Sequence, residues 1–481
     1  MNLRSLAISA TLAFLLAGKG LGNPLTEADI IKLTKDAPAV KGMKLGANQA
    51  DLSANQFQEQ YSSQLVTGLN YSDSNELPTV TGAPVFAPTS TYSAAIQRKL
   101  RNGMAVSLTG LADQRSSNDG KINNLSKSSL EAKVSMDLWK NFLGKFDDQQ
   151  WQSLQLQRQM QDLEAEINSQ SFSYDVRKIY WSLLANRESQ RLANGLLSNA
   201  KRQLKETKRR FKASVANASD VARLNAQVSS RKNILNSLKM QQTALEQSLV
   251  NALPQLAGQQ LSLAPVNLET VILDIMQCTN TIQSSSTNPL DNTKYHELLK
   301  LLDRKYDRDQ SIASSYTDAD VQLMGSYKIA GQANTYADSM ENINDQTLTG
   351  FSVGLQLTIP LGAQKTNSQA SLNRAQRNAY EYEKNMLLAQ LKAERQAISP
   401  QIDLLYASIQ EQKRNSQLLK QSSKSIEKQY KQARISIMEL IREQDALQDS
   451  QLKEIDAYLL VINSLFDYLK MFQETPCKLN S

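Results

Sequence analysis

The sequence has few helix breakers and almost none of the residues that most often carry catalysis. Its 481 residues include 18 glycines and 11 prolines, and this scarcity favours long helices over a loop-rich fold. His296 is the single histidine, which excludes a Ser-His-Asp triad, a Cys-His pair and a histidine-rich metal site unless His296 acts alone. No glycine-rich phosphate loop is present. We therefore expect no enzyme, no cofactor and no metal site.

Cysteine is nearly absent as well. The only two, Cys278 and Cys477, lie far apart in the sequence. A pair of cysteines in an oxidising compartment can form a disulfide, but only if the fold brings them close. A Cys278–Cys477 bridge and two separate buried thiols are both consistent with the sequence.

The net positive charge is small and thinly spread along the chain. The formal net charge is +7 and the mean hydropathy is −0.45, as in a soluble or mostly soluble protein. The one dense basic run is KRQLKETKRRFK, Lys201 to Lys212. No aromatic residues are interleaved for base stacking and no nucleic-acid motif accompanies it. We interpret it as a solvated helix face, without a nucleic-acid partner.

The N-terminus has the pattern of a secretory signal peptide. Arg4 precedes an apolar run from Leu6 to Ala17, and small residues follow it. The run is too short and wrongly flanked for a spanning helix. We predict that residues 1–22 are cleaved after Gly22 and that the mature chain leaves the cytoplasm.

Alternation of apolar and polar residues predicts strands in both halves of the chain. The clearest run, Gly350–Gly362, has Phe351 and Val353 on one face and Ser352 on the other. It spans about eleven residues, near the length at which a tilted strand crosses a bilayer. We predict membrane strands at 62–73 and 129–138, which we pair with each other, and at 320–331 and 350–361. An extra alternating hairpin at 91–112 has no counterpart in the second half, where a polar loop links the strands.

Long helices follow each pair of strands. Apolar residues recur at helical and heptad spacing through 145–253 and again through 365–472, which indicates antiparallel coiled-coil packing. Pro400 lies midway along the second long helix and is expected either to kink it or to split it.

The order of elements occurs twice. FKASVANASDV, Phe211 to Val221, and YKQARISIMEL, Tyr430 to Leu440, share an aromatic-lysine start and a carboxylate at the tenth position, 219 residues apart. We interpret this as a tandem duplication. The first repeat spans 23–262 and the second 288–475, with a linker at 263–287 and a tail at 476–481.

These features resemble the outer membrane efflux proteins of the TolC family, over nearly the whole mature chain. LTEADIIKLTKDAPAVKG, Leu25 to Gly42, is similar to the family's first helix, and LQLTIPLG, Leu355 to Gly362, to a strand ending in its second repeat. The two echoed turns resemble its aromatic-x-x-Gly tip motif.

The resemblance implies a mainly α-helical homotrimer, with a β-barrel in the outer membrane of a Gram-negative bacterium and an α-helical tunnel in the periplasm. Open strand edges are not tolerated in lipid, so four strands per chain require oligomerisation, and three chains give a twelve-stranded barrel. In that frame we expect the hairpin at 91–112 to be an extracellular extension rather than added wall.

In the family, the helical turns close the tunnel and meet the adaptor (membrane fusion) protein of an inner-membrane transporter. Here Ser214 and Ala433 stand where the family has glycine, and Arg442 stands where it tends to have a further carboxylate. The resemblance also leaves Asp220 and Glu439 open to a simpler interpretation, as acids favoured by a helix N-terminus. The residues carried over are Phe211, Ser214, Asn217, Tyr430, Ala433 and Ser436 as adaptor-contacting tips, and Asp220, Glu439, Arg442 and Glu443 at the aperture.

The expected function is an export duct for small molecules or proteins in a multi-component efflux or type I secretion system. A secreted or periplasmic coiled-coil rod or adhesin is the alternative, because long heptads fit it equally well. Lipid-length strands before each long helix favour the duct. A periplasmic adaptor is a third interpretation, disfavoured because no lipoyl-like β domain lies between the helices.

Overall fold

The computed structural model describes residues 24–73, 86–117, 124–284, 293–315, 319–345, 348–359, 363–432 and 434–472. The predicted signal peptide and C-terminal tail lie outside these residues, as does Cys477. The described chain divides into two units. The sheet unit falls within Ala47–Asp162 and Leu298–Asn385, and the helical unit within Met1–Gly46, Leu163–Glu297 and Met386–Ser481.

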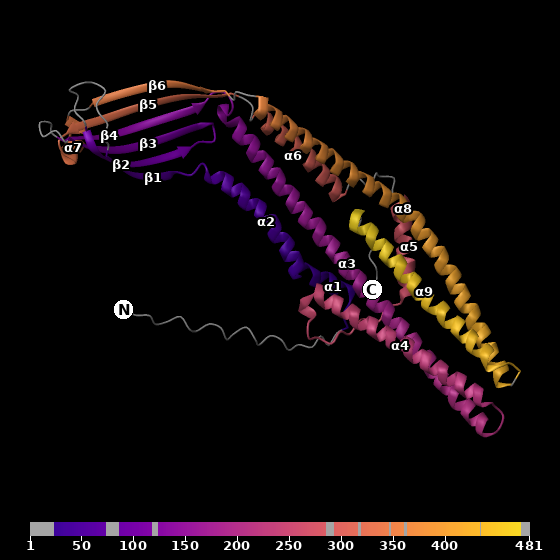
Figure 1. The fold of residues 1–481 in the computed structure, drawn as a ribbon. Helices are drawn as coiled ribbons and strands as arrows, with labels where there is room; N and C mark the ends of the chain where they lie inside the picture. The colour runs from indigo at the N-terminus through magenta and orange to yellow at the C-terminus, as the bar shows by residue number, and fades with distance from the viewer. Residues whose placement is uncertain are drawn as a thin grey trace, which may run out of the picture. The chain divides into compact units, whose positions relative to one another are not determined.

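Long helices and one group of strands make up the described elements (Figure 1). The strands are β1 Gln64–Ser72, β2 Phe86–Lys99, β3 Met104–Ser117, β4 Leu125–Asp137, β5 Asp320–Ala333 and β6 Leu348–Thr358. The helices are α1 Glu27–Lys35, α2 Pro38–Glu59, α3 Lys145–Lys212, α4 Ala218–Ala252, α5 Leu268–Ser284, α6 Lys294–Ser315, α7 Tyr336–Asp345, α8 Ala363–Lys431 and α9 Ile437–Phe472, with short 3₁₀ turns at Phe142–Gly144 and Pro254–Leu256.

The six strands form one antiparallel sheet in the order β1-β2-β3-β4-β5-β6 (Figure 1). β1 pairs with β2, not with β4, so the predicted pairing of 62–73 with 129–138 is wrong. The hairpin predicted at 91–112 is β2 and β3, and it lies within the sheet between β1 and β4. The expectation of an extracellular extension is therefore also wrong. β2 and β3 have 14 residues each, close to the 13 of β4, and they pair along nearly the full length of β1 and β4.

One face of the sheet is apolar. A single row of cross-strand neighbours contains one residue from each strand: Leu65, Ile96, Leu108, Ala132, Tyr327 and Phe351. The row one residue along has its side chains on the other face and includes Thr109, Glu131 and Lys328. Phe351 is 84% exposed and Leu65 70% exposed in the single chain. This alternation separates a large uncovered apolar surface from a polar one.

Two glycines fix the junction between the sheet and α3. Gly103, in the β2–β3 turn, and Gly144, just before α3, both have positive φ, +77° and +81°. A Cβ on Gly144 would lie 1.8 Å from the carbonyl oxygen of Arg101, and one on Gly103 would lie 2.2 Å from that of Asn141. The two turns therefore pack backbone to backbone, which only glycine permits. Asp147, in the first turn of α3, completes the junction with an ion pair to Lys99 (3.0 Å).

Two helices form where the sequence analysis expected none. α5 lies in the segment assigned as a linker; Asn267 caps it by accepting from the N–H of Glu269 (3.0 Å), and Val271 and Ile275 are fully buried. Apolar spacing and a helix-start residue were both present there. α7 lies in the polar loop between β5 and β6. Gly331 of β5 permits its close approach, since a Cβ there would lie 2.2 Å from the Ser339 carbonyl oxygen.

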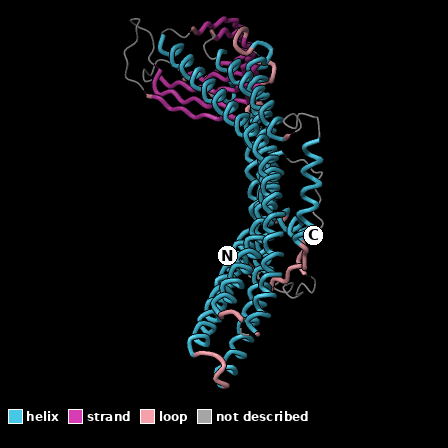
Figure 2. Tube along the Cα trace, turned by 90° about the vertical axis from the view of Figure 1, so that its right-hand side faces the viewer, coloured by secondary structure: helices cyan, strands magenta, loops and turns pink. Residues whose placement is uncertain are grey.

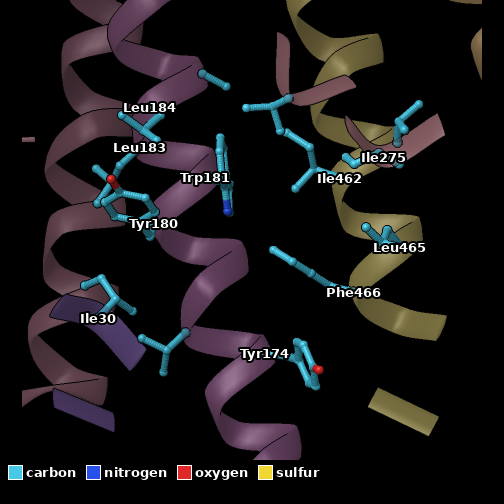
Figure 3. Packing of buried hydrophobic residues seen from close by; sticks show 14 of the residues in the cluster. Ile30, Tyr174, Tyr180, Trp181, Leu183, Leu184, Ile275, Ile462, Leu465 and Phe466 are labelled. Atoms are coloured by element: carbon cyan, nitrogen blue, oxygen red, sulfur yellow. The ribbon is translucent and has the colours of Figure 1, made fainter. Parts of the chain in front are cut away.

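The core of the helical unit is built on Tyr180 and Trp181 of α3, both fully buried (Figure 3). Phe466 of α9 and Ile30 of α1 belong to the same cluster. A buried ion pair lies beside it: Glu27 Oε1 accepts from Arg177 Nε (2.6 Å) and from the indole Nε1 of Trp181 (3.1 Å). Because the charges are paired and hydrogen-bonded, they are compatible with this buried position.

α3 with α4 and α8 with α9 form the helical hairpins (Figure 1). α8 is one helix from Ala363 to Lys431 with Pro400 inside it, so the proline does not split it. Among the described residues, no helix combines the length and apolarity needed to cross a membrane.

Candidate functional site

Each of the two hairpins ends in a turn (Figure 2), and the two turns contain the same hydrogen bond. In the first tip, residues 211–220, the N–H of Val215 donates to the carbonyl of Arg210 (2.8 Å). In the second tip, residues 430–439, the N–H of Arg434 donates to the carbonyl of Gln429 (3.0 Å). Each bond spans five residues, as in a Schellman helix end, and the two are 219 residues apart. The hydrogen bonds of the two turns thus follow the same 219-residue offset as the echoed sequence.

Ser214 takes a left-handed conformation of the kind that glycine most easily adopts. Its φ is +57°, in the left-handed region that costs a residue with a Cβ roughly 1–2 kcal/mol. Ala433, at the equivalent place in the second tip, lies outside the described residues. The turn thus keeps a glycine-type geometry without glycine, at a cost in strain.

Asp220 and Glu439 both hold the start of the returning helix. Asp220 accepts from the N–H of Asn217 (3.3 Å), and Glu439 accepts from that of Ser436 (3.3 Å), whose hydroxyl accepts in turn from the N–H of Glu439 (3.3 Å). These are the bonds of a capping box, a role open to any acid at a helix start. Glu439 is nonetheless exposed and Asp220 half-buried, so both carboxylates still reach solvent.

The two hairpins contact each other near their tips. The hydroxyls of Thr207 on α3 and Tyr430 on α8 lie 3.1 Å apart. The guanidinium of Arg210 lies over the Tyr430 ring, 5.4 Å from its centroid. A small core of Leu224, Ile437 and Leu440 packs beneath them. Tyr430 is thus committed to a contact within the chain, whereas Phe211, its equivalent in the first tip, is 46% exposed.

An ion pair further along α4 and α9 was not foreseen from the sequence. Arg231 Nη2 donates to Asp445 Oδ1 (2.5 Å), and the Arg231 side chain is only 4% exposed. Burial lowers the pKa of Arg231, and the Asp445 carboxylate opposes that shift. Gln227 donates to Gln444 one turn closer to the tip (3.3 Å). The available signal was Arg231 itself, in a heptad seam of α4 whose positions are mostly apolar.

The remaining predicted residues are spread over different places. Arg442 is exposed and Glu443 half-buried on the first turns of α9. Cys278 is buried in α5; Cys477 lies outside the described residues, so both alternatives that the sequence left open, a Cys278–Cys477 bridge and two separate thiols, stay open. His296 lies in the first turn of α6, away from either tip in sequence. Within the described ranges, no group of three or more His, Cys, Asp or Glu side chains is arranged to hold a metal ion.

Solved structures share this fold. The chain aligns with the CmeC outer membrane channel of Campylobacter jejuni at a TM-score of 0.67 and 12% identity, covering 98% of this chain and 93% of that one. It aligns with the outer membrane protein VceC of Vibrio cholerae at a TM-score of 0.66 and 12% identity, covering 92% of this chain and 95% of that one.

The open state of the MtrE outer membrane channel of Neisseria gonorrhoeae aligns at a TM-score of 0.62 and 12% identity, covering 93% of this chain and 88% of that chain. No protein-family model matches the sequence, and no curated protein matches it. The likeness therefore lies in the fold, and at that level the resemblance inferred from the sequence is confirmed.

Proposed function

We propose that this chain, which has the fold of outer-membrane channels, is itself an outer-membrane channel and the exit duct of a multi-component export system. The observation that carries the proposal is the uncovered apolar row across all six strands, from Leu65 to Phe351, backed by a polar face. A lipid-facing wall with a wet interior needs this arrangement. A soluble coiled-coil rod does not need it, which disfavours the alternative.

The open edges of the sheet support an oligomer. β1 and β6 each pair on one side only in the described sheet, and unpaired backbone groups are not stable in hydrocarbon. Closure with further copies satisfies them. In a homotrimer, three chains of six strands give eighteen, in place of the twelve that four strands per chain implied.

Membrane fractionation of a matched pair of variants tests the channel assignment. Phe351→Lys places a charge on the apolar face, and Ser352→Lys places the same charge one residue away on the polar face. A lysine in lipid costs roughly 2–4 kcal/mol at mid-depth. We expect a high-salt wash to release Phe351→Lys from outer membranes and to leave Ser352→Lys in them. Equal retention of both variants, or wild type released by the wash, contradicts the assignment.

For the tips, we propose contact with a periplasmic adaptor protein and a carboxylate-lined aperture. Exposed Phe211 supports the first, and the solvent-reaching carboxylates of Asp220 and Glu439 support the second. Cargo is a small molecule or a protein carried from an inner-membrane transporter.

Ion selectivity in planar bilayers tests the aperture. Asp220→Asn with Glu439→Gln removes both charges, whereas Asp220→Glu with Glu439→Asp keeps them and the capping groups. We expect cation preference to fall in the first double variant and to persist in the second. If cation preference is unchanged in both double variants and conductance is intact, Asp220 and Glu439 do not line the aperture, although the protein is still a channel.

A further inference from the structure

A stripe of basic side chains runs along each hairpin toward its tip. The first stripe is Lys201, Lys205, Arg209 and Lys212 on α3. The second stripe is Lys420, Lys424, Lys428 and Lys431 on α8. The spacing of i, i+4, i+8 and i+11 places each set on one helix face. All eight side chains are exposed.

The stripes occupy equivalent positions in the two repeats. Each residue of the first stripe corresponds to one of the second at the offset of 219 that relates the tips. When 199–212 is set against 418–431, the only identical pairs are Lys201 with Lys420, Lys205 with Lys424, and Lys212 with Lys431. The rest of this stretch has diverged, so the repeats retain the charges while losing the sequence around them. A merely solvated face does not need the same four positions twice.

The first stripe faces away from the buried side of α3, and on α8 Ile426, two positions from both Lys424 and Lys428, packs against the small core near the tips. Gln203 and Thr207, each two positions from Lys205, are buried, and residues two apart lie on roughly opposite sides of a helix. Lys431 has an ion pair with Glu427 (2.8 Å). None of the other seven side chains has a salt bridge among the residues that the structure describes. Like charges at i and i+4 destabilise a helix, so seven of the eight residues destabilise their helix with no ion pair among the described residues to offset the repulsion.

We propose that the two stripes dock a protein partner whose helical surface presents carboxylates at matching spacing. This inference rests on the proposed function and gives the chemistry of the partner that meets the tips. From Lys201 to Lys212 a stripe extends about 16 Å along the helix. The partner therefore overlaps the sides of the hairpins and does not only touch their ends. A line of cations fits a line of carboxylates, whereas a small anion needs basic groups that converge on one point.

Binding of a defined acidic probe tests the proposal. The probe is a labelled synthetic helical hairpin with glutamates at i, i+4, i+8 and i+11 on one face, and its control carries glutamines there. Anisotropy is measured with the purified full-length protein in detergent. We expect the glutamate hairpin to bind, with affinity that falls as salt rises, because exposed ion pairs are screened, and the glutamine hairpin to bind at least about tenfold more weakly.

Variants assign that binding to the stripes. The triple variant Lys201→Glu/Lys205→Glu/Lys212→Glu should weaken it about tenfold or more, since each exposed ion pair contributes and reversal adds repulsion. The matched control, Arg223→Glu/Lys232→Glu/Lys239→Glu, makes the same charge change at exposed positions of α4 and should stay within about twofold. If the charge-reversed triple fails to fold, Lys→Gln at the same three stripe positions replaces it in the binding assay, because it removes the charges without reversing them.

Four outcomes overturn the proposal. If the stripe and control triples lose the same affinity, net charge alone explains the binding. If the glutamine hairpin binds as tightly as the glutamate hairpin, the protein does not recognise the carboxylates. Equally tight, stripe-dependent binding to phosphatidylglycerol vesicles assigns the stripes to lipid. A change of oligomeric state in the stripe triple, seen by analytical ultracentrifugation, assigns them to contacts between copies of this chain. The probe assay does not depend on conduction, so its failure is separate from a failure of wild-type protein to form channels.

Discussion

At the scale of single residues, backbone conformation decides what the tips and the sheet junction tolerate. Ser214 sits at φ +57° and Gly144 at φ +81°. The echoed motif located Ser214 in the sequence, because the tip motif that it resembles has glycine at this position. Gly144, by contrast, has the sequence surroundings of an ordinary helix start. Only glycine fits at position 144 because the backbone of Arg101, more than forty residues earlier, packs against it. The local sequence around Gly144 gives no sign of that contact.

Ser214→Gly is expected to stabilise the first tip by roughly 1 kcal/mol, because it removes the Cβ from a left-handed conformation. Hydrogen exchange at the Val215 amide, which closes the turn, should slow correspondingly. Ser219→Gly, in the first turn of α4, is the matched control. It should speed exchange there, because glycine costs a helix about 0.5–1 kcal/mol. Faster exchange in Ser214→Gly would count against the left-handed turn.

Gly144→Ala and Gly195→Ala should have opposite effects. At Gly144 the new methyl group meets the Arg101 carbonyl at 1.8 Å in a left-handed conformation, whereas at Gly195, inside α3, nothing lies within 4 Å. We expect Gly144→Ala to lower the melting temperature and the yield of folded protein. Gly195→Ala should raise the melting temperature, since alanine favours the helix by about 1 kcal/mol. Equal effects of the two substitutions would contradict the close packing of the turns.

At the scale of elements, the periodicity of the sequence predicted which segments are strands or helices better than it predicted which strands are neighbours. Alternation located the strands, and it separated the faces on which Phe351 and Ser352 lie. It did not reveal which strands are neighbours, because every strand of the sheet alternates alike. The sequence predicted the hairpin at 91–112 outside the wall because it has no counterpart in the second half and the resemblance implied four strands per chain, although consecutive strands usually pair. Short α7 was missed because its ten residues follow no long apolar pattern.

The Arg231–Asp445 pair is expected to couple the two hairpins. Asp445→Asn leaves the buried guanidinium without its countercharge, which should loosen the contact between α4 and α9. Because Asp445 itself is 58% exposed, we expect a cost toward the low end of the roughly 1–3 kcal/mol for an unsatisfied buried group. Arg231→Met should cost less, since it removes the charge and retains apolar volume.

Hydrogen exchange along 224–235 and 440–450 measures this coupling. Asp449→Asn serves as the control, because Asp449 forms an exposed ion pair with Lys453 on the same helix and should contribute little. If Asp445→Asn and Asp449→Asn have the same effect, Arg231 and Asp445 do not link the hairpins.

At the scale of the whole molecule, the number of strands per chain sets the width of the proposed pore. Barrel diameter grows roughly linearly with strand number, so eighteen strands give a lumen about one and a half times as wide as twelve. The resemblance to known channels led us to expect four strands per chain. The pairing of β2 and β3 within the sheet raises the number per chain to six.

Deletion of residues 86–117 should narrow the pore. Because strand directions alternate across the sheet, β1 and β4 are antiparallel and can pair once β2 and β3 are removed. We expect polyethylene glycols that enter the wild-type lumen from the sheet side, and lower its conductance, to be excluded from the variant. Circular dichroism and sizing establish that the variant folds and assembles. An unchanged size limit would place the hairpin outside the pore wall.

Single-channel recording of the purified mature protein in planar lipid bilayers tests the central claim most directly. The account predicts uniform, long-lived channels from the oligomer, because closure of the sheet places its apolar face in lipid and its polar face around water. Protein shown to be folded and oligomeric that inserts into no bilayer and carries no current would contradict it.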